Sequence, residues 1–88
     1  MPIISKFYGI IITMYMEEDG KHHKKHIHIK YNNYKAIFDF EGNLISGKIP
    51  NKQKKMVQAW IAIHEEELYR LWKNLQEGKE HFKIKPLE

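Results

Sequence analysis

The 88-residue sequence contains no cysteine, which excludes disulfide bonds and every zinc or iron–sulfur site built on thiolates. It also lacks any uninterrupted apolar run near the roughly 20 residues that a membrane helix needs. The opening residues, Met1 to Lys6, are not the basic stretch followed by a long apolar run of a secretory signal. We therefore expect a cytoplasmic protein that does not enter the membrane.

Arginine is almost absent, because 14 of the 15 basic residues are lysine and Arg70 is the exception. The net charge of +4 favours acidic partners such as RNA, another nucleic acid or an acidic protein. Lysine carries a flexible point charge, so this composition favours contacts with phosphate over the reading of bases. A solvated lysine surface without any partner explains the same composition equally well.

The composition that remains is globular, with 42% hydrophobic and 12% aromatic residues, and the length suits one domain over residues 1–88. We predict an α+β fold, an antiparallel meander of three to four strands packed against one long C-terminal helix. The strands fall within residues 7–48, the helix covers about 52–77, and residues 79–88 form a short tail that docks back or frays.

Alternating apolar residues predict the strands. Phe7 to Met16 reads as one central strand with two largely apolar faces. Two further runs, His26–Tyr31 and Tyr34–Phe40, are separated by two asparagines, which tolerate positive φ and favour a two-residue hairpin turn. That turn sets Ile27 opposite Phe38 and His26 opposite Asp39. A short fourth strand follows over residues 44–48.

The C-terminal half predicts the helix. Asn51 suits the N-cap and Gly78 the position just past the end. Between them, residues at 3.6-residue spacing form one apolar stripe: Val57, Trp60, Ile61, His64, Leu68, Leu71, Trp72 and Leu75. This stripe is expected to pack on the apolar face of the sheet.

A cluster of histidines is the most informative feature for chemistry. His26 and His28 lie two apart on a strand and so point the same way, with Asp39 across the ladder from His26. A carboxylate that orients an imidazole is an arrangement used in acid/base catalysis. The alternative is a pair of solvent-facing histidines with a weak cross-strand His–Asp pair. His22 is an additional candidate.

Two further arrangements of histidines are candidate sites. His22, His26 and His28 would suit zinc or nickel, but the ligand set is incomplete, so we predict no metal and no cofactor. His64 lies on the apolar stripe, where a core histidine making one hydrogen bond is favoured over a residue at the edge of an active cleft. The segment after it is not a zinc-protease helix, because the second histidine would have to stand at Leu68.

Four lysines surround the predicted start of the helix: Lys48, Lys52, Lys54 and Lys55. Free backbone N–H groups at a helix start already favour anions, so these lysines are a candidate site for phosphate or nucleic acid. A merely solvated run of lysines is equally compatible with the pattern.

The order of several segments resembles a small bacterial family called domain of unknown function 4160. The segments are Met1 to Ile10, the spacing His22-x3-His26-x-His28, Tyr34 to Ala36, Gly47 to Pro50, and Trp60 to Trp72. Members of that family carry two prolines where this chain has Lys24 and Lys25, and an aspartate where it has Lys21.

The resemblance implies a toxin-like component of a small toxin–antitoxin-type module, neutralised by a cognate small antitoxin-like protein. Small bacterial toxins are often ribonucleases, so it also suggests a metal-independent RNA-cleaving enzyme. His28 and His26 would then act as base and acid, Asp39 would orient His26, and the lysines at the helix start would hold the RNA backbone. The competing hypotheses are a non-catalytic basic binding protein, such as a phage- or mobile-element-encoded inhibitor, and a metal-binding module.

Overall fold

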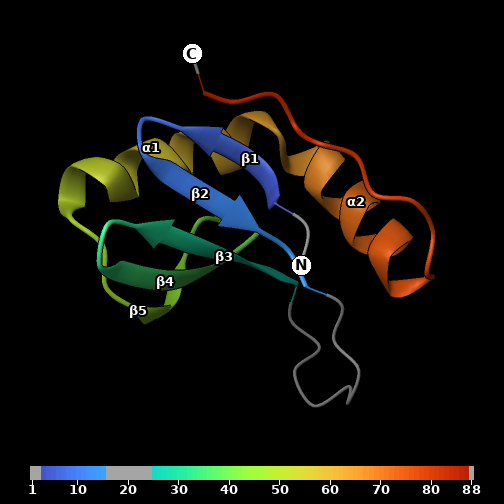
Figure 1. Ribbon diagram of the computed structural model, residues 1–88, viewed down its shortest axis with the longest axis horizontal. Helices are drawn as coiled ribbons and strands as arrows, with labels where there is room; N and C mark the ends of the chain where they lie inside the picture. Colours follow the sequence, from blue (N-terminus) through green and yellow to red (C-terminus); the bar gives the residue numbers. More distant parts are fainter. Residues whose placement is uncertain (1–2, 16–24, 88) are drawn as a thin grey trace.

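The computed structural model describes residues 3–15 and 25–87. These residues form one antiparallel sheet, with its five strands side by side in chain order, followed by two helices (Figure 1). The strands are β1 (Ile3–Phe7), β2 (Ile10–Thr13), β3 (His26–Tyr31), β4 (Tyr34–Asp39) and β5 (Leu44–Gly47). The predicted α+β class and the meander are confirmed, while the prediction of three to four strands is wrong.

The extra strand comes from a hairpin near the start of the chain. Tyr8 and Gly9 have φ angles of 48° and 79°, so the chain turns back and Phe7 pairs with Ile10. Positive φ at both central residues gives a turn whose twist matches the strands it joins. The single strand predicted from Phe7 is therefore two strands, and the sheet begins before residue 7. Met16 lies outside the described residues.

The β3–β4 hairpin has the register that the sequence predicts. Ile27 faces Phe38 and His26 faces Asp39, and Asn32 in the turn has a φ of 51°. The predicted fourth strand is β5, which ends at Gly47 and pairs with β4 through one irregularity in register.

The predicted single helix is two helices, α1 (Asn51–Ile63) and α2 (Glu65–Gln76). His64 separates them with φ −110° and ψ 24°, and Pro50, not Asn51, is the N-cap of α1. Three glutamates follow His64 directly, and carboxylates in a first turn favour a new helix start there. None of the helices in the described part of the chain is long and apolar enough to cross a membrane.

One hydrophobic core joins the helices to the sheet. All eight residues of the predicted helical stripe are buried, as are Ile10, Ile12, Ile27 and Phe38 on the strands. In Figure 1, α1 passes behind the sheet and α2 continues past its edge. The sheet therefore has one face in the core and an opposite face, which we call the open face, that the helices leave uncovered except at His26, whose ring lies 5.5 Å from that of Trp72 on α2.

The C-terminal tail docks along β1. The backbone N–H of Ile84 donates to the carbonyl of Ile4 at 2.8 Å, and the Trp60 indole N–H donates to the carbonyl of Lys85 at 2.9 Å. Ile84 is 2% exposed and belongs to the core. The tail, expected either to dock back or to fray, is docked in the structure over residues 79–87.

Candidate functional site

Two rows of side chains cross the open face of the sheet. Residues paired across an antiparallel ladder point to the same face, so each row can be followed from strand to strand. The first, the lysine row, contains Lys6, Ile11, Lys30 and Lys35 on β1 to β4. The second, the histidine row, contains Thr13, His28, Ile37 and Ser46 on β2 to β5.

The lysine row is closely spaced. Neighbouring strands lie about 4.8 Å apart, so the backbones of Lys30 and Lys35 are adjacent and Lys6 is about 10 Å from Lys30. The N–H of Lys48 donates to the carbonyl of Lys35 at 3.0 Å, which brings a fourth lysine to the end of the row. Like charges directly opposite each other destabilise a sheet. A row of this kind is therefore ready to accept an anion.

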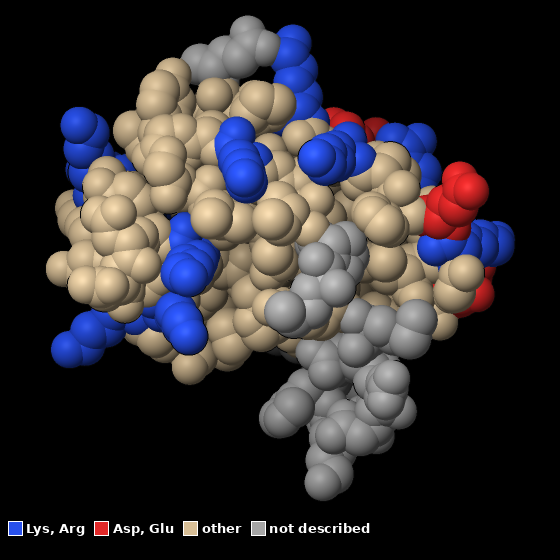
Figure 2. All heavy atoms as spheres, viewed as in Figure 1, with Lys and Arg blue, Asp and Glu red and all other residues tan. Residues whose placement is uncertain are grey.

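A shallow depression of about 690 Å³ lies on the open face. Its lining includes Tyr15, His28, Lys30, Lys35 and Ile37, and none of the residues described as lining it is acidic. Figure 2 shows lysine side chains spread over this face, with the acidic side chains in view gathered toward the side of α2 and the tail. The depression thus combines positive charge with aromatic and apolar surface.

The two candidate catalytic histidines lie together but in different surroundings. The ring centroids of His26 and His28 are 5.3 Å apart. His28 is half-buried and meets Tyr15 edge-on, with centroids 4.4 Å apart. His26 is 9% exposed, and its ring lies 5.5 Å from that of Trp72 on α2. His28 is therefore the more accessible of the pair.

Asp39, at the end of β4, accepts hydrogen bonds from the turn that follows it. Its Oδ1 accepts hydrogen bonds from the N–H groups of Glu41 and Asn43, both at 2.9 Å, and its Oδ2 accepts one from the Asn43 side chain at 3.1 Å. The side chain is 1% exposed. Asp39 is the predicted neighbour of His26 in the register, but these three bonds hold the turn between β4 and β5.

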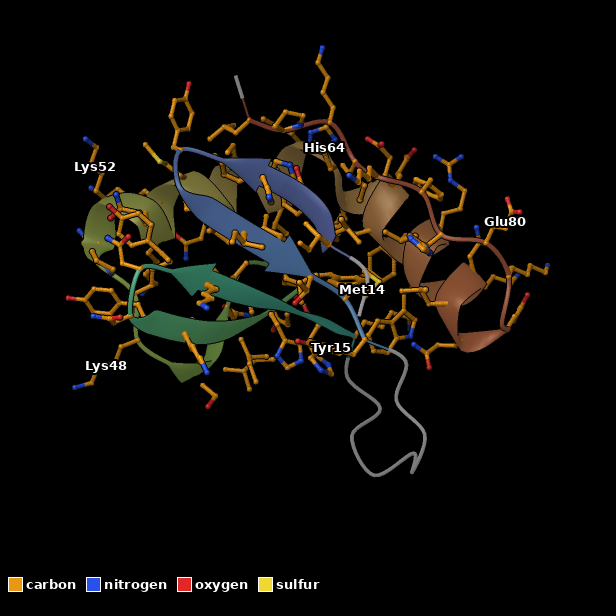
Figure 3. The ribbon with its side chains drawn as sticks, viewed as in Figure 1. Met14, Tyr15, Lys48, Lys52, His64 and Glu80 are labelled. Atoms are coloured by element: carbon orange, nitrogen blue, oxygen red, sulfur yellow. The ribbon has the colours of Figure 1, made fainter. Side chains whose placement is uncertain are left out.

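The four lysines predicted around the helix start lie on α1 and on the segment just before it. Lys48 joins the lysine row, whereas Lys52, Lys54 and Lys55 lie near the start of α1. Figure 3 shows Lys48 and Lys52 at one end of the molecule, well away from Tyr15, which contacts His28. The structure therefore separates the lysines of α1 from the histidine pair they were expected to assist.

His64 sits between the two helices and is 9% exposed (Figure 3). Its Nδ1 lies 2.7 Å from Oε1 of Glu67, and its ring is 5.4 Å from that of Trp60. These contacts fit the favoured interpretation of a core histidine. His22 lies outside the described residues, and among residues 3–15 and 25–87 no three histidines, aspartates or glutamates could hold a metal ion.

In a comparison with known protein families, residues 9–73 match the model of a domain of unknown function, DUF4160. The chain belongs to this family. The DUF4160 segment runs from the first turn into α2, so it contains His26, His28, Lys30, Lys35 and Asp39. No curated protein and no solved structure matches the chain.

The sequence analysis did not include Lys30, Lys35 and Tyr15, which line the depression, among the candidate site residues. The hairpin register already put Lys30 and Lys35 on the same face as His28, which was the signal available. The sequence did not predict that Lys6 joins them, because β1 was not predicted. It also did not predict which face of the sheet the helices leave uncovered.

Proposed function

We propose that this protein binds single-stranded RNA on the open face of its sheet, as the toxin-like component of a small bacterial toxin–antitoxin-type module. The observation that carries the proposal is the lysine row, Lys6, Lys30 and Lys35, bordered by His28 and Tyr15. Phosphates would lie along the lysines, while Tyr15 offers an aromatic surface on which a base can stack.

The physical reasons favour a single strand over a duplex. An open sheet bearing aromatic and basic side chains suits unpaired nucleotides, whose bases are free to stack. Lysine makes point contacts with phosphate and no bidentate contacts with bases, so the binding is expected to show little sequence preference. A cognate antitoxin-like partner would neutralise the protein by presenting carboxylates to the same row.

RNA cleavage is the second candidate function, and the closeness of His26 and His28 favours it. His28 would take the proton from a ribose 2′-OH as its oxygen attacks the phosphorus. The bond from phosphorus to the 5′ oxygen would break, with His26 giving that oxygen a proton and a 2′,3′-cyclic phosphate remaining. The 9% exposure of His26 weighs against this step, so binding without cleavage is the better-supported function.

The binding proposal is tested with a labelled single-stranded RNA oligonucleotide and fluorescence anisotropy over a series of salt concentrations. Three phosphate contacts predict a slope of log K against log salt of about −2. The Lys30→Gln/Lys35→Gln variant should weaken binding and make the slope shallower by about 1.4. The matched control, Lys52→Gln/Lys55→Gln on α1, should change neither, and equal losses in both variants would overturn the proposal.

The cleavage step is tested separately by inducible expression in a bacterial host. The native chain is compared with a His26→Ala/His28→Ala variant that circular dichroism shows to be folded. Growth arrest with RNA cleavage in the native chain alone would support histidine catalysis. Arrest by both proteins without RNA cleavage would exclude that mechanism and leave RNA binding as the function.

A further inference from the structure

The open face carries its side chains in a fixed order along the strands. On β3, Lys30 belongs to the lysine row and His28, two residues before it, belongs to the histidine row. On β2, Thr13 lies in the histidine row, and Tyr15 follows two residues further on and meets His28 edge-on. Alternate residues of a strand are about 6.6 Å apart. Along the strands the face therefore changes from cationic, to neutral and hydrogen-bonding, to aromatic.

A nucleotide presents three kinds of surface in the same order: an anionic phosphate, a ribose and an aromatic base. With the phosphates on the lysine row and a base against Tyr15, the ribose lies over the histidine row. Figure 3 shows Lys48, at the end of the lysine row, well away from Tyr15. The 2′-OH of the ribose, which donates and accepts hydrogen bonds, is what distinguishes RNA from DNA at a binding site. The histidine row is thus the part of this face that meets the sugar.

Hydroxyl side chains are scarce in this chain, and two of them lie in the histidine row. Ser5, Thr13 and Ser46 are its only serine and threonine residues. Thr13 pairs with His28 and Ser46 pairs with Ile37, and both hydroxyl residues line the depression. Thr13 is half-buried and Ser46 is exposed, so a ligand on the open face can reach them. A hydroxyl group can donate one hydrogen bond and accept others, as a ribose 2′-OH requires of its partner.

The two hydroxyl residues lie at opposite ends of the histidine row. Thr13 is on β2 and Ser46 is on β5, so three strand spacings of about 4.8 Å, or about 14 Å in all, separate their backbones. This distance is too long for both to contact one ribose. The lysine row crosses the same strands beside them, so a nucleic-acid strand that follows the lysines brings successive sugars to the two hydroxyls.

We propose that Thr13 and Ser46 hydrogen-bond ribose 2′-OH groups and make the open face selective for RNA over single-stranded DNA. This inference rests on the proposed function, because it assigns the sugar specificity of the same surface. The lysines contact phosphates, which RNA and DNA share, and Tyr15 can stack on the bases of either, so neither provides this selectivity. One hydrogen bond between neutral groups changes affinity about two- to tenfold, so two should favour RNA by about fivefold to a hundredfold.

The selectivity is tested by fluorescence anisotropy with oligouridine and oligodeoxyuridine of equal length, which differ only in the 2′-OH. The native chain should bind oligouridine more tightly by the factor given above. The Thr13→Val/Ser46→Ala variant, shown to be folded by circular dichroism, should bind both with the affinity that the native chain has for oligodeoxyuridine. The matched control Thr13→Ser keeps the hydroxyl and should keep the preference for RNA.

A lysine variant provides a second readout. Lys30→Gln/Lys35→Gln removes contacts with phosphate alone, so it should weaken the binding of both oligonucleotides by the same factor and leave the ratio of their affinities unchanged. A fall in that ratio would overturn the separation of phosphate contacts from sugar contacts on which the proposal depends.

Three outcomes distinguish this inference from the proposed function. Equal affinity of the native chain for the two oligonucleotides would overturn the inference and leave the binding of single-stranded RNA standing. A preference for RNA that survives in Thr13→Val/Ser46→Ala would overturn the role of these two hydroxyls. Failure of the native chain to bind either oligonucleotide would contradict the proposed function, and the inference with it.

Discussion

Lys30 and Lys35 face each other across the β3–β4 ladder, on the side of the sheet that points away from α1 and α2. Nothing in the fold requires two cations there, because neither side chain contributes to the core. The pair carries an electrostatic cost that an anionic ligand would remove, which is why we assign the open face to RNA.

Replacing one member of this pair separates stability from binding. Lys35→Glu converts a repulsive cross-strand pair into an attractive one and should stabilise the fold by about 0.2–1 kcal/mol. The same substitution should abolish RNA binding, because it places a carboxylate in the lysine row. Urea unfolding measures the first effect and anisotropy the second. A variant that is less stable than the native chain would contradict this account of the pair.

Asp39→Ala should destabilise the protein by roughly 2–3 kcal/mol, because it leaves the N–H groups of Glu41 and Asn43 without their acceptor. Because Asp39 is only 1% exposed, the substitution is expected to lower the stability of the folded protein. Chemical denaturation measures it, with Glu41→Ala, an exposed neighbour, as the control that should change little. A folded, fully stable Asp39→Ala variant would instead mean that the carboxylate is not needed by the turn.

Two glycines with positive φ allow a matched test of close packing at the β5 edge. Gly47 has φ 84° and a Cβ there would overlap the carbonyl oxygen of Lys35, whereas Gly78 has φ 73° and open space around it. Gly78→Ala should cost about 1–2 kcal/mol from the backbone alone. Gly47→Ala should cost about 1–3 kcal/mol more, from the overlap. Equal losses in thermal unfolding would show that β5 does not pack against β4 as described.

The docked tail predicts a large effect from one side chain near the C-terminus. Ile84→Ala should cost about 2–4 kcal/mol, since Ile84 is 2% exposed and belongs to the core. His81→Ala, on an exposed residue of the same tail, should change stability by less than about 0.5 kcal/mol. Proteolysis of the tail in Ile84→Ala, but not in His81→Ala, would accompany the loss. Equal stability of the two variants would contradict docking.

Much of the fold could be predicted from local pattern. Strict alternation and the two asparagines between β3 and β4 determine the register, and the 3.6-residue stripe identifies every helical residue of the core. These patterns are local and each is repeated several times, so a single unusual residue does not hide them.

The errors came from single positions. Gly9 suits the turn between β1 and β2, but Tyr8 beside it adopts a positive φ that tyrosine rarely takes, so the residue types marked only half of the turn. The break at His64 is concealed because the apolar stripe runs through it without interruption. The hydrogen bonds of Asp39 to the β4–β5 turn are a further feature that the register does not predict, because the register places Asp39 opposite His26 but does not give the contacts of its carboxylate.

Only part of the candidate surface could be predicted from the sequence, because β1 was not predicted. Lys30 and Lys35 belong to a predicted hairpin, but Lys6 joins them through a strand that was not predicted. Which face of a sheet the helices cover depends on packing, so the lysines of α1 seemed equally good candidates.

The most direct test of the central claim is a titration of the ¹⁵N-labelled protein with a single-stranded RNA oligonucleotide, followed by amide chemical shifts. We predict chemical-shift changes at the amides of Lys6, Ile11, His28, Lys30 and Lys35, and no changes at those of Lys52, Lys54 and Lys55 on α1. Shifts confined to the start of α1, or no shifts at saturating RNA, would contradict it.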